Sequence, residues 1–562
     1  MFGTEPDSAA HRVLLCAELC NLICEDCDRQ TLLALSRTCH DIKEAALDLL
    51  WSEIPDLSVL VRCMPGDLWE ERELCGCRYV VIIVVISIVC YGAHGLLVAL
   101  QGNTGDRLAP IQHVFRQGQK VGSSPFLLGW HAPHVEAALA SEDNHLNAGT
   151  YRTLSHAAYG MELLPRIQEI IWEIEGDDVY PYITLLLSRM TCRLWLYFPH
   201  DLDLSIEERS QSQRMRFSLM PSILSSSPHI TELSLRGFKT DLESWPDVRD
   251  ALNSLRFWSS LQFLTLHYFP EASVIILREI PNLRKLYLFD CHREPLLPLP
   301  LPSGCHGFQT LASLKIKNND LESLIAATSI MRNTPLRSLR AKSSPKDTAS
   351  VDDWKRLFDV MRDNITHLSL EVVTLKFINN DIDHFNDDEH PRSPMTLDEI
   401  SGLLVFTNLF HLSLEATHGF DLDDEQIRTL ASALPHLKEL HLHSYYPLAD
   451  WPRMTFEGLD SIAQHCPELQ SLTVAFDARH IIKRSKNLSI CNVNIKSLQI
   501  LDSAIDDPAA VSVYLSAIFP NLVEFSWVDF HFIPQEVEHA LEEMKEKWQE
   551  MNDLMKAKKE SK

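Results

Sequence analysis

Leucine or isoleucine recurs at positions 1, 4 and 6 of a six-residue unit along most of the chain. The units, three of which end in another apolar residue or lack the last leucine, are Ile230-Leu233-Leu235, Leu261-Leu264-Leu266, Leu283-Leu286-Leu288, Leu311-Leu314-Ile316, Leu336-Leu339, Ile365-Leu368-Leu370, Leu409-Leu412-Leu414, Leu437-Leu440-Leu442, Leu469-Leu472-Val474, Ile495-Leu498-Ile500 and Leu522-Phe525-Trp527. Successive units mostly begin 22 to 32 residues apart, with one gap of 44. A period of this length predicts an array in which each repeat is one supersecondary unit.

The spacing within each unit also predicts its local structure. Positions 4 and 6 fall on one side of a β-strand, so their side chains point inward while the residues between them face outward. The segments between units, such as Leu321 to Met331 and Asp424 to Leu434, have helical periodicity. The pattern is typical of a leucine-rich-repeat solenoid over 163–530, an α/β fold with parallel strands on the concave face and helices on the convex face. An ordinary α/β domain with leucine-rich strands is the alternative.

Two segments depart from the repeat. The range 372–397 fills the gap of 44 and is rich in aspartate, which suggests calcium ligands. It lacks the glycine and spacing of a calcium loop, so we expect a solvated acidic loop. The tail, 534–562, is predicted to be a charged helix with a thin apolar stripe of Val537, Leu541, Met544 and Trp548. It is expected to cap the end of the repeats.

The N-terminal segment His11 to Trp51 has a different character. Residues 1–10 are expected to be disordered, and three short helices are predicted in 11–52 from apolar residues at helical spacing. About forty residues in three helices bury little surface on their own, so they must dock on the chain or on a partner. The alternative is a three-helix piece of an unrelated core.

This segment resembles an F-box, the motif that binds the Skp-type adaptor of cullin ubiquitin ligases. The resemblance rests on a spaced set of apolar and acidic residues, on Ser36-Arg37-Thr38-Cys39 and on the ending ALDLLW. Ala17 stands where F-boxes usually have proline, a residue pre-organised for the first helical turn. The resemblance implies that the adaptor is contacted, directly or through the helices that do so, by Leu15, Glu18, Leu19, Leu22, Ile23, Leu32, Leu35, Leu50 and Trp51.

A helical linker is predicted for 53–75, and the sequence then changes abruptly. Val80 to Leu100 carries no formal charge over twenty-one residues, long enough to cross a bilayer. A membrane helix, a buried strand pair and a retained intron or mis-joined exon are the three interpretations. We favour the third, because 76–157 loses the family resemblance and Leu163 onward regains it. The insert is then expected to be poorly ordered or loosely packed.

The composition and the absence of certain motifs argue against several classes of function. A net charge of −26 argues against a nucleic-acid partner. No signal peptide is visible, and fourteen cysteines without regular disulfide spacing fit a reducing compartment, so cytoplasm or nucleus is expected. There is no phosphate loop, HExxH pair or nucleophile elbow, so we expect neither catalysis nor a cofactor.

Cysteines near the N-terminus raise a zinc hypothesis. Cys16, Cys20 and Cys24 lie four residues apart, with Cys27 and Cys39-His40 close by. Four thiolates bind zinc tetrahedrally. One stripe of a helix suits packing better than a closed cage, and cysteine is often an ordinary buried residue. We therefore expect no metal here.

The outward positions of the predicted strands are the candidate binding residues. The basic and aromatic members of the early repeats are Arg236, Lys285, Tyr287, Lys315, Lys317 and Arg340, and the histidines of the later repeats are His367, His411, His441 and His443. A cationic strip on an acidic molecule would select an anionic segment, including a phosphorylated one. Scattered solvated side chains are the alternative, and for the histidines we expect no bound metal.

The order of an F-box followed by leucine-rich repeats resembles fungal (basidiomycete-type) F-box/leucine-rich-repeat proteins over 11–73 and 163–530. The resemblance implies a substrate receptor of an SCF-type ubiquitin ligase, with the Skp-type adaptor, a cullin and an unknown substrate protein as partners. Two alternatives remain: a leucine-rich-repeat interaction protein acting outside a ligase, and a membrane-anchored protein that uses Val80 to Leu100.

Overall fold

The structure is a computed structural model of the whole chain. It divides into two compact units, Met1–Ser254 and Leu255–Lys562. The residues that the structure describes are 24, 27, 29–37, 42–43, 46, 53–54, 69–74, 77–82, 135–138, 149, 151–152, 155, 167–173, 178–198, 206–236, 253–267, 276–289, 308–343, 350–377, 394–444, 452–480, 490–527 and 535–560.

The N-terminal unit contains a parallel sheet with the strand order β1-β4-β5-β6-β7 and an antiparallel hairpin of β2 and β3. Its strands are β1 (Glu53–Ile54), β2 (Trp69–Leu74), β3 (Cys77–Ile82), β4 (Val135–Ala138), β5 (Ile167–Glu173), β6 (Arg193–Tyr197) and β7 (Glu232–Arg236). Its helices are α3 (Arg29–Leu35), η1 (Tyr180–Tyr182), α8 (Ile183–Leu186), α9 (Ile206–Ser218) and α10 (Met220–Ser226).

The linker predicted to be helical, 53–75, contains strands instead. β1 pairs with β4, and β2 pairs with β3 in register from Trp69↔Ile82 to Leu74↔Cys77. The prediction was wrong because β3 supplies the β-branched residues Val80, Val81 and Ile82 as a pairing partner, and such pairing overrides the local preference of a glutamate-rich segment.

The atypical insert, 76–157, holds β3 and β4, and most of Val80 to Leu100 lies outside the described residues. None of the helices in the described part of the chain combines the length and apolar character that crossing a bilayer requires.

Two repeats precede the first one recognised in the sequence. In β6 the inward residues are Leu194 and Leu196, but position 1 is Thr191, which is fully buried. The Thr191 hydroxyl donates a hydrogen bond to the backbone carbonyl of Ile167 over 3.2 Å, which satisfies it inside the core. In β5 the sixth position is Trp172 in place of leucine. These substitutions hide both repeats from a search for leucine and isoleucine alone.

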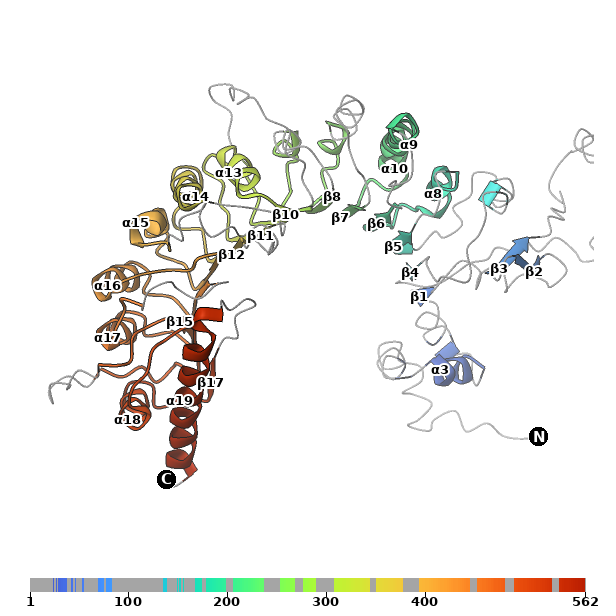
Figure 1. Cartoon of the computed structure of the whole chain (residues 1–562). Coiled ribbons are helices and arrows are strands. Elements are labelled where there is room, and N and C mark those ends of the chain that lie inside the picture. Colours follow the sequence, from blue (N-terminus) through green and yellow to red (C-terminus); the bar gives the residue numbers. More distant parts are fainter. Residues whose placement is uncertain are drawn as a thin grey trace, which may run out of the picture. The chain divides into compact units, whose positions relative to one another are not determined.

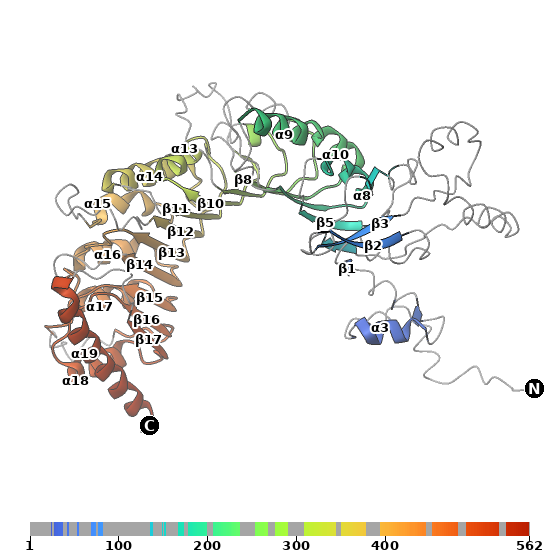
Figure 2. The same ribbon diagram turned by 45° about the vertical axis from the view of Figure 1, so that its right-hand side comes forward.

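The C-terminal unit is a leucine-rich-repeat array. Its parallel strands pair in sequence order with helices on one side of the sheet, as Figures 1 and 2 show. The strands are β8 (Phe263–His267), β9 (Lys285–Phe289), β10 (Ser313–Asn319), β11 (Ser338–Ser343), β12 (Val372–Phe377), β13 (His411–Ala416), β14 (Glu439–Ser444), β15 (Ser471–Val474), β16 (Ser497–Ile500) and β17 (Glu524–Trp527). The helices are α13 (Leu321–Ser329), α14 (Val351–Asn364), α15 (Leu397–Ile400), η3 (Ser401–Leu403), α16 (Asp424–Ala433), α17 (Phe456–His465), α18 (Pro508–Ile518) and α19 (Gln535–Glu560).

The register of the sheet aligns the inward residues into rows. Leu264 pairs with Leu286, Leu286 with Leu314 and Leu314 with Leu339, and the row continues strand by strand to Phe525. The first four of these leucines are fully buried. Full burial of a leucine side chain contributes about 1.5–3 kcal/mol. Each row is therefore a large apolar surface that only a neighbouring repeat can cover.

Asparagines at the entrance to the strands join one repeat to the next. The Nδ2 atom of Asn282 donates to the carbonyl of Ser259 over 2.6 Å, and Asn408 donates to Leu368 over 2.7 Å. Asn494 and Asn521 donate in the same way to Pro467 and Val493, each over 2.8 Å. Each asparagine stands directly before position 1 of a repeat, so an asparagine at that position has a structural role.

One repeat lies in a different frame from the prediction. The unit Ile365-Leu368-Leu370 is not a strand; β12 begins at Val372, inside the predicted acidic loop 372–397. Ile365 is the C-cap of α14, and residues 367–369 form a turn that leaves Leu368 69% exposed, whereas Leu370 is fully buried. The true positions 1, 4 and 6 are Leu370-Val373-Leu375, because only that frame buries every apolar residue. Residues 378–393 of the loop lie outside the described residues.

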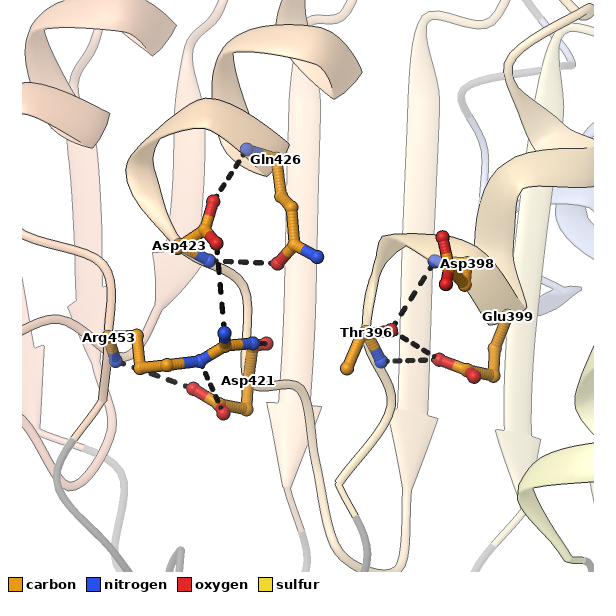
Figure 3. Close-up of polar contacts among 7 residues, drawn as sticks. All are labelled: Thr396, Asp398, Glu399, Asp421, Asp423, Gln426 and Arg453. Carbon is orange, nitrogen blue, oxygen red and sulfur yellow. Dashed lines mark hydrogen bonds and ion pairs between the residues drawn. The ribbon is translucent and has the colours of Figure 1, made fainter.

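The N-terminal ends of the helices are capped by polar side chains. Thr396 and Glu399 form a capping box at α15, and Asp423 and Gln426 form one at α16. In the second box the Gln426 amide donates to Asp423 Oδ1 over 2.9 Å and the Asp423 amide to Gln426 Oε1 over 3.0 Å, as drawn in Figure 3. Such reciprocal bonds satisfy amides that the helix itself leaves unpaired.

The same edge carries contacts between repeats. Arg453, in the segment that leads to α17, donates from Nε to Asp421 Oδ2 over 2.7 Å and lies 3.7 Å from Asp423 Oδ2 (Figure 3). Asp424, the first residue of α16, accepts bonds from the amides of Thr455 and Gly458 at the start of α17, over 2.7 and 2.8 Å. One repeat therefore caps the helix of the next.

The tail forms α19, which packs on α18 and β17. Leu541, Met544 and Trp548 are buried, and the stripe continues through Met551 and Met555. The Trp548 indole donates to the carbonyl of Ser503 over 2.7 Å. Its ring stacks on Phe525, the inward residue of the last described strand, with centroids 5.6 Å apart.

The repeat frame at β12 can be tested by two alanine substitutions. Leu370→Ala should lower the free energy of unfolding of the C-terminal unit by about 2–5 kcal/mol, because it opens a cavity in a packed core. Leu368→Ala should change it by less than about 0.5 kcal/mol, because that side chain is exposed. Thermal unfolding followed by calorimetry measures both, and equal effects would contradict the frame.

The cap supplied by Asp424 can be tested against its neighbour. Asp424→Ala should destabilise the C-terminal unit by about 1–2 kcal/mol, because amides at the start of α17 lose their acceptor. Glu425→Ala is the control, since Glu425 is exposed in the same turn and its carboxylate pairs with Arg428 of its own helix. Hydrogen exchange of the Thr455 and Gly458 amides should accelerate in the first variant alone.

Candidate functional site

The free face of the repeat sheet carries rows of outward side chains, fixed by the same register that aligns the leucines. Two of these rows contain most of the charged and aromatic side chains. The middle row runs Thr265, Tyr287, Lys315, Arg340, Thr374, Ser413, His441, Thr473, Gln499 and Ser526, and the end row runs His267, Phe289, Lys317, Lys342, Lys376, Glu415 and His443. Neighbouring members of a row stand on adjacent strands, about 4.8 Å apart.

Five of these residues form a cationic patch, defined as Lys315, Lys317, Arg340, Lys342 and Lys376. Lys315 pairs in register with Arg340, and Lys317 with Lys342, which pairs with Lys376. Lys315, Lys317 and Arg340 were predicted from the sequence to lie on this face, and Lys342 and Lys376 were not. Lys342 follows an alanine where the repeat usually has leucine. Lys376 lies in the range predicted to be an acidic loop, because the predicted repeat frame at β12 was wrong.

The cations of the patch crowd one another. Burial lowers the pKa of Lys315, and the positive charges of Lys317 and Arg340 lower it further. Lys376 is paired with Glu415, its Nζ lying 2.7 Å from Oε2. Among the described residues, no hydrogen bond or ion pair joins the side chains of Lys315, Lys317, Arg340 or Lys342 to an acidic group. The patch is thus a local excess of positive charge on a chain of net charge −26.

Aromatic rings border the patch on the side of β8 and β9. Lys315 Nζ lies 5.2 Å from the ring centroid of Tyr287, and Lys317 Nζ lies 5.5 Å from that of Phe289. His267 stacks on Phe289 with centroids 4.3 Å apart. A second aromatic pair, Phe263 and Tyr287, meets edge to face at 4.7 Å, with Lys285 5.9 Å from Phe263. Cation–π contacts of this kind hold the amines against an apolar surface.

On the other side of the patch lies a cluster of three histidines, His411, His441 and His443. The rings of His411 and His441 are 6.1 Å apart, and those of His441 and His443 are 5.8 Å apart and stacked. His411 Nδ1 lies 2.8 Å from Glu439 Oε2. None of the described residues forms a group of three or more side chains suited to holding a metal ion.

Two of the three histidines, His441 and His443, have lowered pKa values. Burial lowers the pKa of His441 to about 4, and the nearby His443 and His411 lower it while Glu439 opposes the shift. Burial also lowers the pKa of His443, against the attraction of Glu415. At neutral pH these two rings are therefore uncharged. His441 Nδ1 lies 2.8 Å from the hydroxyl of Thr473 on the adjacent strand.

One predicted member of the face, His367, does not lie on a strand. It lies in the turn after α14, with Nε2 2.7 Å from the carbonyl of Arg362, because the predicted repeat frame was wrong there. Arg236 stands on the strand of its repeat as predicted; that strand, β7, belongs to the N-terminal unit, and the Arg236 guanidinium lies 4.8 Å from the ring centroid of Tyr197. Lys285 and Tyr287 stand on β9 as expected from their positions in the repeat.

The predicted adaptor-binding residues are only partly described. Leu32 is buried in a small core with Cys24, Ile42 and Ala46, and Leu35 packs against it. Cys24 is thus a packing residue, as its helical spacing suggested. The other members of the predicted set lie outside the described residues; they are Leu15, Glu18, Leu19, Leu22, Ile23, Leu50 and Trp51.

Comparisons with known proteins give distant likenesses. No family model matches the chain, and no curated protein matches it. A leucine-rich-repeat protein of Leptospira interrogans superposes with a TM-score of 0.31 and 13% identity, covering 68% of this chain and 85% of that one. A chain of the yeast Rad7 and Elc1 complex superposes with a TM-score of 0.26 and 13% identity, covering 70% and 86%.

The lowered pKa of His441 predicts a pH dependence of stability. Between about pH 6.5 and pH 4 the unfolded chain binds a proton that the folded ring does not, so stability falls as the pH falls through this window. His441→Asn should therefore reduce the loss of thermal stability between pH 7 and pH 5. Identical pH profiles for the variant and the unaltered chain would refute the assignment.

Proposed function

We propose that the chain is a substrate-recognition subunit of an SCF-type E3 ubiquitin ligase. Its segment 11–52 would dock on a Skp-type adaptor, and through it a cullin, while the free face of the repeats binds a substrate protein. The observation that carries the proposal is the order of the chain: an F-box-like segment comes first, and a leucine-rich-repeat array follows.

The free face of the repeats supports the second half of the proposal. The inward rows are uniformly apolar, whereas the outward rows change from aromatic to cationic to histidine and acidic residues along the array. The fold requires none of this variety, because outward side chains do not fill the core. A long surface of mixed chemistry suits recognition of another protein, the use that solenoids commonly make of this face.

The helical core around Leu32 supports the first half. Cys24, Leu32, Ile42 and Ala46 come from segments up to 22 residues apart and pack together, as the helices of an adaptor-docking module must. So small a core is marginal alone, which favours a segment that gains stability by binding.

The proposed mechanism is scaffolding and not chemistry. A rigid bridge between adaptor and substrate raises the effective concentration of substrate lysines near the ubiquitin-loaded enzyme. The chain itself would form no covalent intermediate and would need no cofactor. Cytoplasm and nucleus, where such ligases act, are the proposed locations.

Co-purification with a Skp-type adaptor tests the proposal. The full chain should retain the adaptor through gel filtration, and a variant lacking residues 1–52 should lose it, because the F-box-like helices make the contact. The deletion variant should keep the calorimetric transition of the C-terminal unit, which shows that the repeats remain folded.

A folded full-length chain that ignores the adaptor would exclude the ligase role. The chain would then be a leucine-rich-repeat interaction protein acting outside a ligase. A chain that binds the adaptor but never brings a cullin with it would point to the same alternative. A chain that needs detergent for extraction would point to the membrane-anchored alternative.

A further inference from the structure

A ridge of exposed side chains follows the edge of the array where the chain enters its strands. Each member stands directly before the first residue of one of the strands β13 to β17. The backbone amide of each later member donates to the carbonyl of the previous one, over 2.7 to 2.9 Å. Neighbours along the ridge are therefore about 4.8 Å apart. These residues are called the entry ridge below; they are Phe410, Lys438, Gln470, Lys496 and Val523.

The entry ridge has a chemistry that the core does not require. All five side chains are exposed, and Phe410 and Val523 at its ends are 37% and 74% exposed. Lys438 and Lys496 stand between these apolar residues, about 9.6 Å apart because two strand spacings separate them. Lys438 Nζ lies 3.8 Å from Glu468 Oε2, but both side chains are 47% exposed. An ion pair so open to water contributes little, so Lys438 can bind a second anion.

The outer face of α19 carries the opposite charge. The seam from Leu541 to Met555 is buried against α18 and β17, and the other side of the helix faces water. Lys545 and Lys547 lie among the acids, and Lys547 pairs with Glu543 over 2.9 Å. Acids still outnumber lysines by five to two between residues 542 and 554. The exposed members of this acidic face are Glu542, Glu543, Glu546, Gln549, Glu550, Asp553 and Leu554.

The charges of the two surfaces have a similar spacing. Glu546 and Asp553 lie seven residues apart on the side of α19 opposite the buried seam. Because an α-helix rises about 1.5 Å per residue, these two acids are about 10.5 Å apart along the axis. Lys438 and Lys496 are about 9.6 Å apart along the ridge. One acid can therefore meet each lysine when such a helix lies along the ridge.

The uncharged side chains of the two surfaces also correspond. Gln549 lies between the two acids, as Gln470 lies between the two lysines. Leu554 directly follows Asp553 and is 39% exposed, and Phe410 lies next to the first lysine of the ridge. A helix that places Asp553 on that lysine therefore brings Leu554 against Phe410. The contact would remove two exposed apolar side chains from water, which favours association.

We propose that the chain forms a two-fold dimer in which α19 of each copy lies along the entry ridge of the other. Asp553 of one copy pairs with Lys438 of the other, and Glu546 pairs with Lys496. The two-fold axis makes both contacts identical and closes the assembly at two chains. The proposal does not depend on the ligase role.

Both surfaces lie at the same end of the array, as a two-fold contact requires. α19 stands beside α18 and β17 (Figures 1 and 2). The amine of Lys559, near the end of α19, donates to the carbonyl of Leu522, the neighbour of Val523. Within one copy α19 cannot cover the ridge, because its buried seam holds it on α18 and β17. The α19 of a second copy can do so, since its acidic face is exposed.

The short ridge suits an acidic helix better than a nucleic acid. A nucleic-acid strand needs a continuous basic track, whereas the ridge offers two lysines separated by a glutamine. Each copy carries a net charge of −26, but repulsion between distant charges is largely screened beyond about 10 Å in about 0.1 M salt. The opposite charges in contact at the ridge are screened much less.

Sedimentation velocity of the full-length chain tests the proposal. With rising concentration, the measured mass should increase from that of one chain toward that of two. The ridge variant Lys438→Glu/Lys496→Glu should raise the dissociation constant of the dimer at least about tenfold, because like charges then face each other. The helix variant Glu546→Lys/Asp553→Lys should have the same effect for the same reason. Added sodium chloride should weaken the dimer of the unaltered chain.

Mixing the two variants shows whether the two surfaces meet. Each variant keeps one surface and reverses the charge of the other, so ridge and helix match again in both halves of a mixed dimer. The mixture should therefore dimerise like the unaltered chain, although neither variant does so alone. The control Lys355→Glu/Arg428→Glu makes the same change in net charge as the ridge variant, at exposed residues of α14 and α16, and should dimerise normally. Circular dichroism checks that all variants are folded.

Three results would overturn the proposal. The first is the mass of one chain at every concentration. The second is a dimer that neither variant weakens, because the interface would then lie elsewhere. The third is a mixture of the two folded variants that stays monomeric, because α19 and the entry ridge would then not be in contact.

Discussion

The burial of two apolar side chains per strand against the next repeat is the interaction on which the C-terminal unit depends. No repeat can cover its own inward residues, so the rows beginning at Leu264 and Leu266 exist only as a stack. A slip of one residue in strand pairing would move every side chain to the opposite face of the sheet. Burial of the inward rows therefore also fixes the register of the residues on the free face. The placement of Lys315 beside Arg340 is therefore a consequence of packing leucines.

The free face separates charge by position. The cationic patch occupies β10 to β12, and the histidine cluster with Glu415 and Glu439 occupies β13 and β14. Lys376 joins the two, since it belongs to the patch and pairs with Glu415. The uncharged rings of His441 and His443 offer hydrogen-bonding groups without adding to the positive charge. A ligand lying across the strands would thus meet three chemically different sections in a fixed order.

The sequence predicts the repeats well wherever leucine occupies the diagnostic positions. Strands such as β8, β9, β13 and β14 can be placed from Leu264, Leu286, Leu412 and Leu440, because period-2 burial is a local property. The prediction from sequence fails where a residue other than leucine or isoleucine fills the inward position. Buried Thr191 satisfies its hydroxyl through a backbone carbonyl of the previous repeat, a partner that no local pattern reveals.

The candidate site is predictable to the same extent. Residues in correctly framed strands, such as Lys315 and His441, fall where the pattern puts them, although no sequence argument gives their protonation. At β12 two frames five residues apart both offer apolar positions, and they are separated by the pairing of β12 with β11 and by the exposure of Leu368. That ambiguity misplaced His367 and hid Lys376. The pairing of cations across strands depends on register, which is a property of the assembled sheet.

The helix α19 affects how readily the repeat sheet associates with other copies of the chain. A parallel sheet can always be extended by one more strand, and the edge of β17 is a template for doing so. Trp548 covers Phe525 there and bonds to the carbonyl of Ser503. The helix α19 therefore ends the stack of strands by covering its last member. A chain that ends before residue 535 would expose the edge of β17. Such molecules would pair through their exposed edge strands and assemble into filaments.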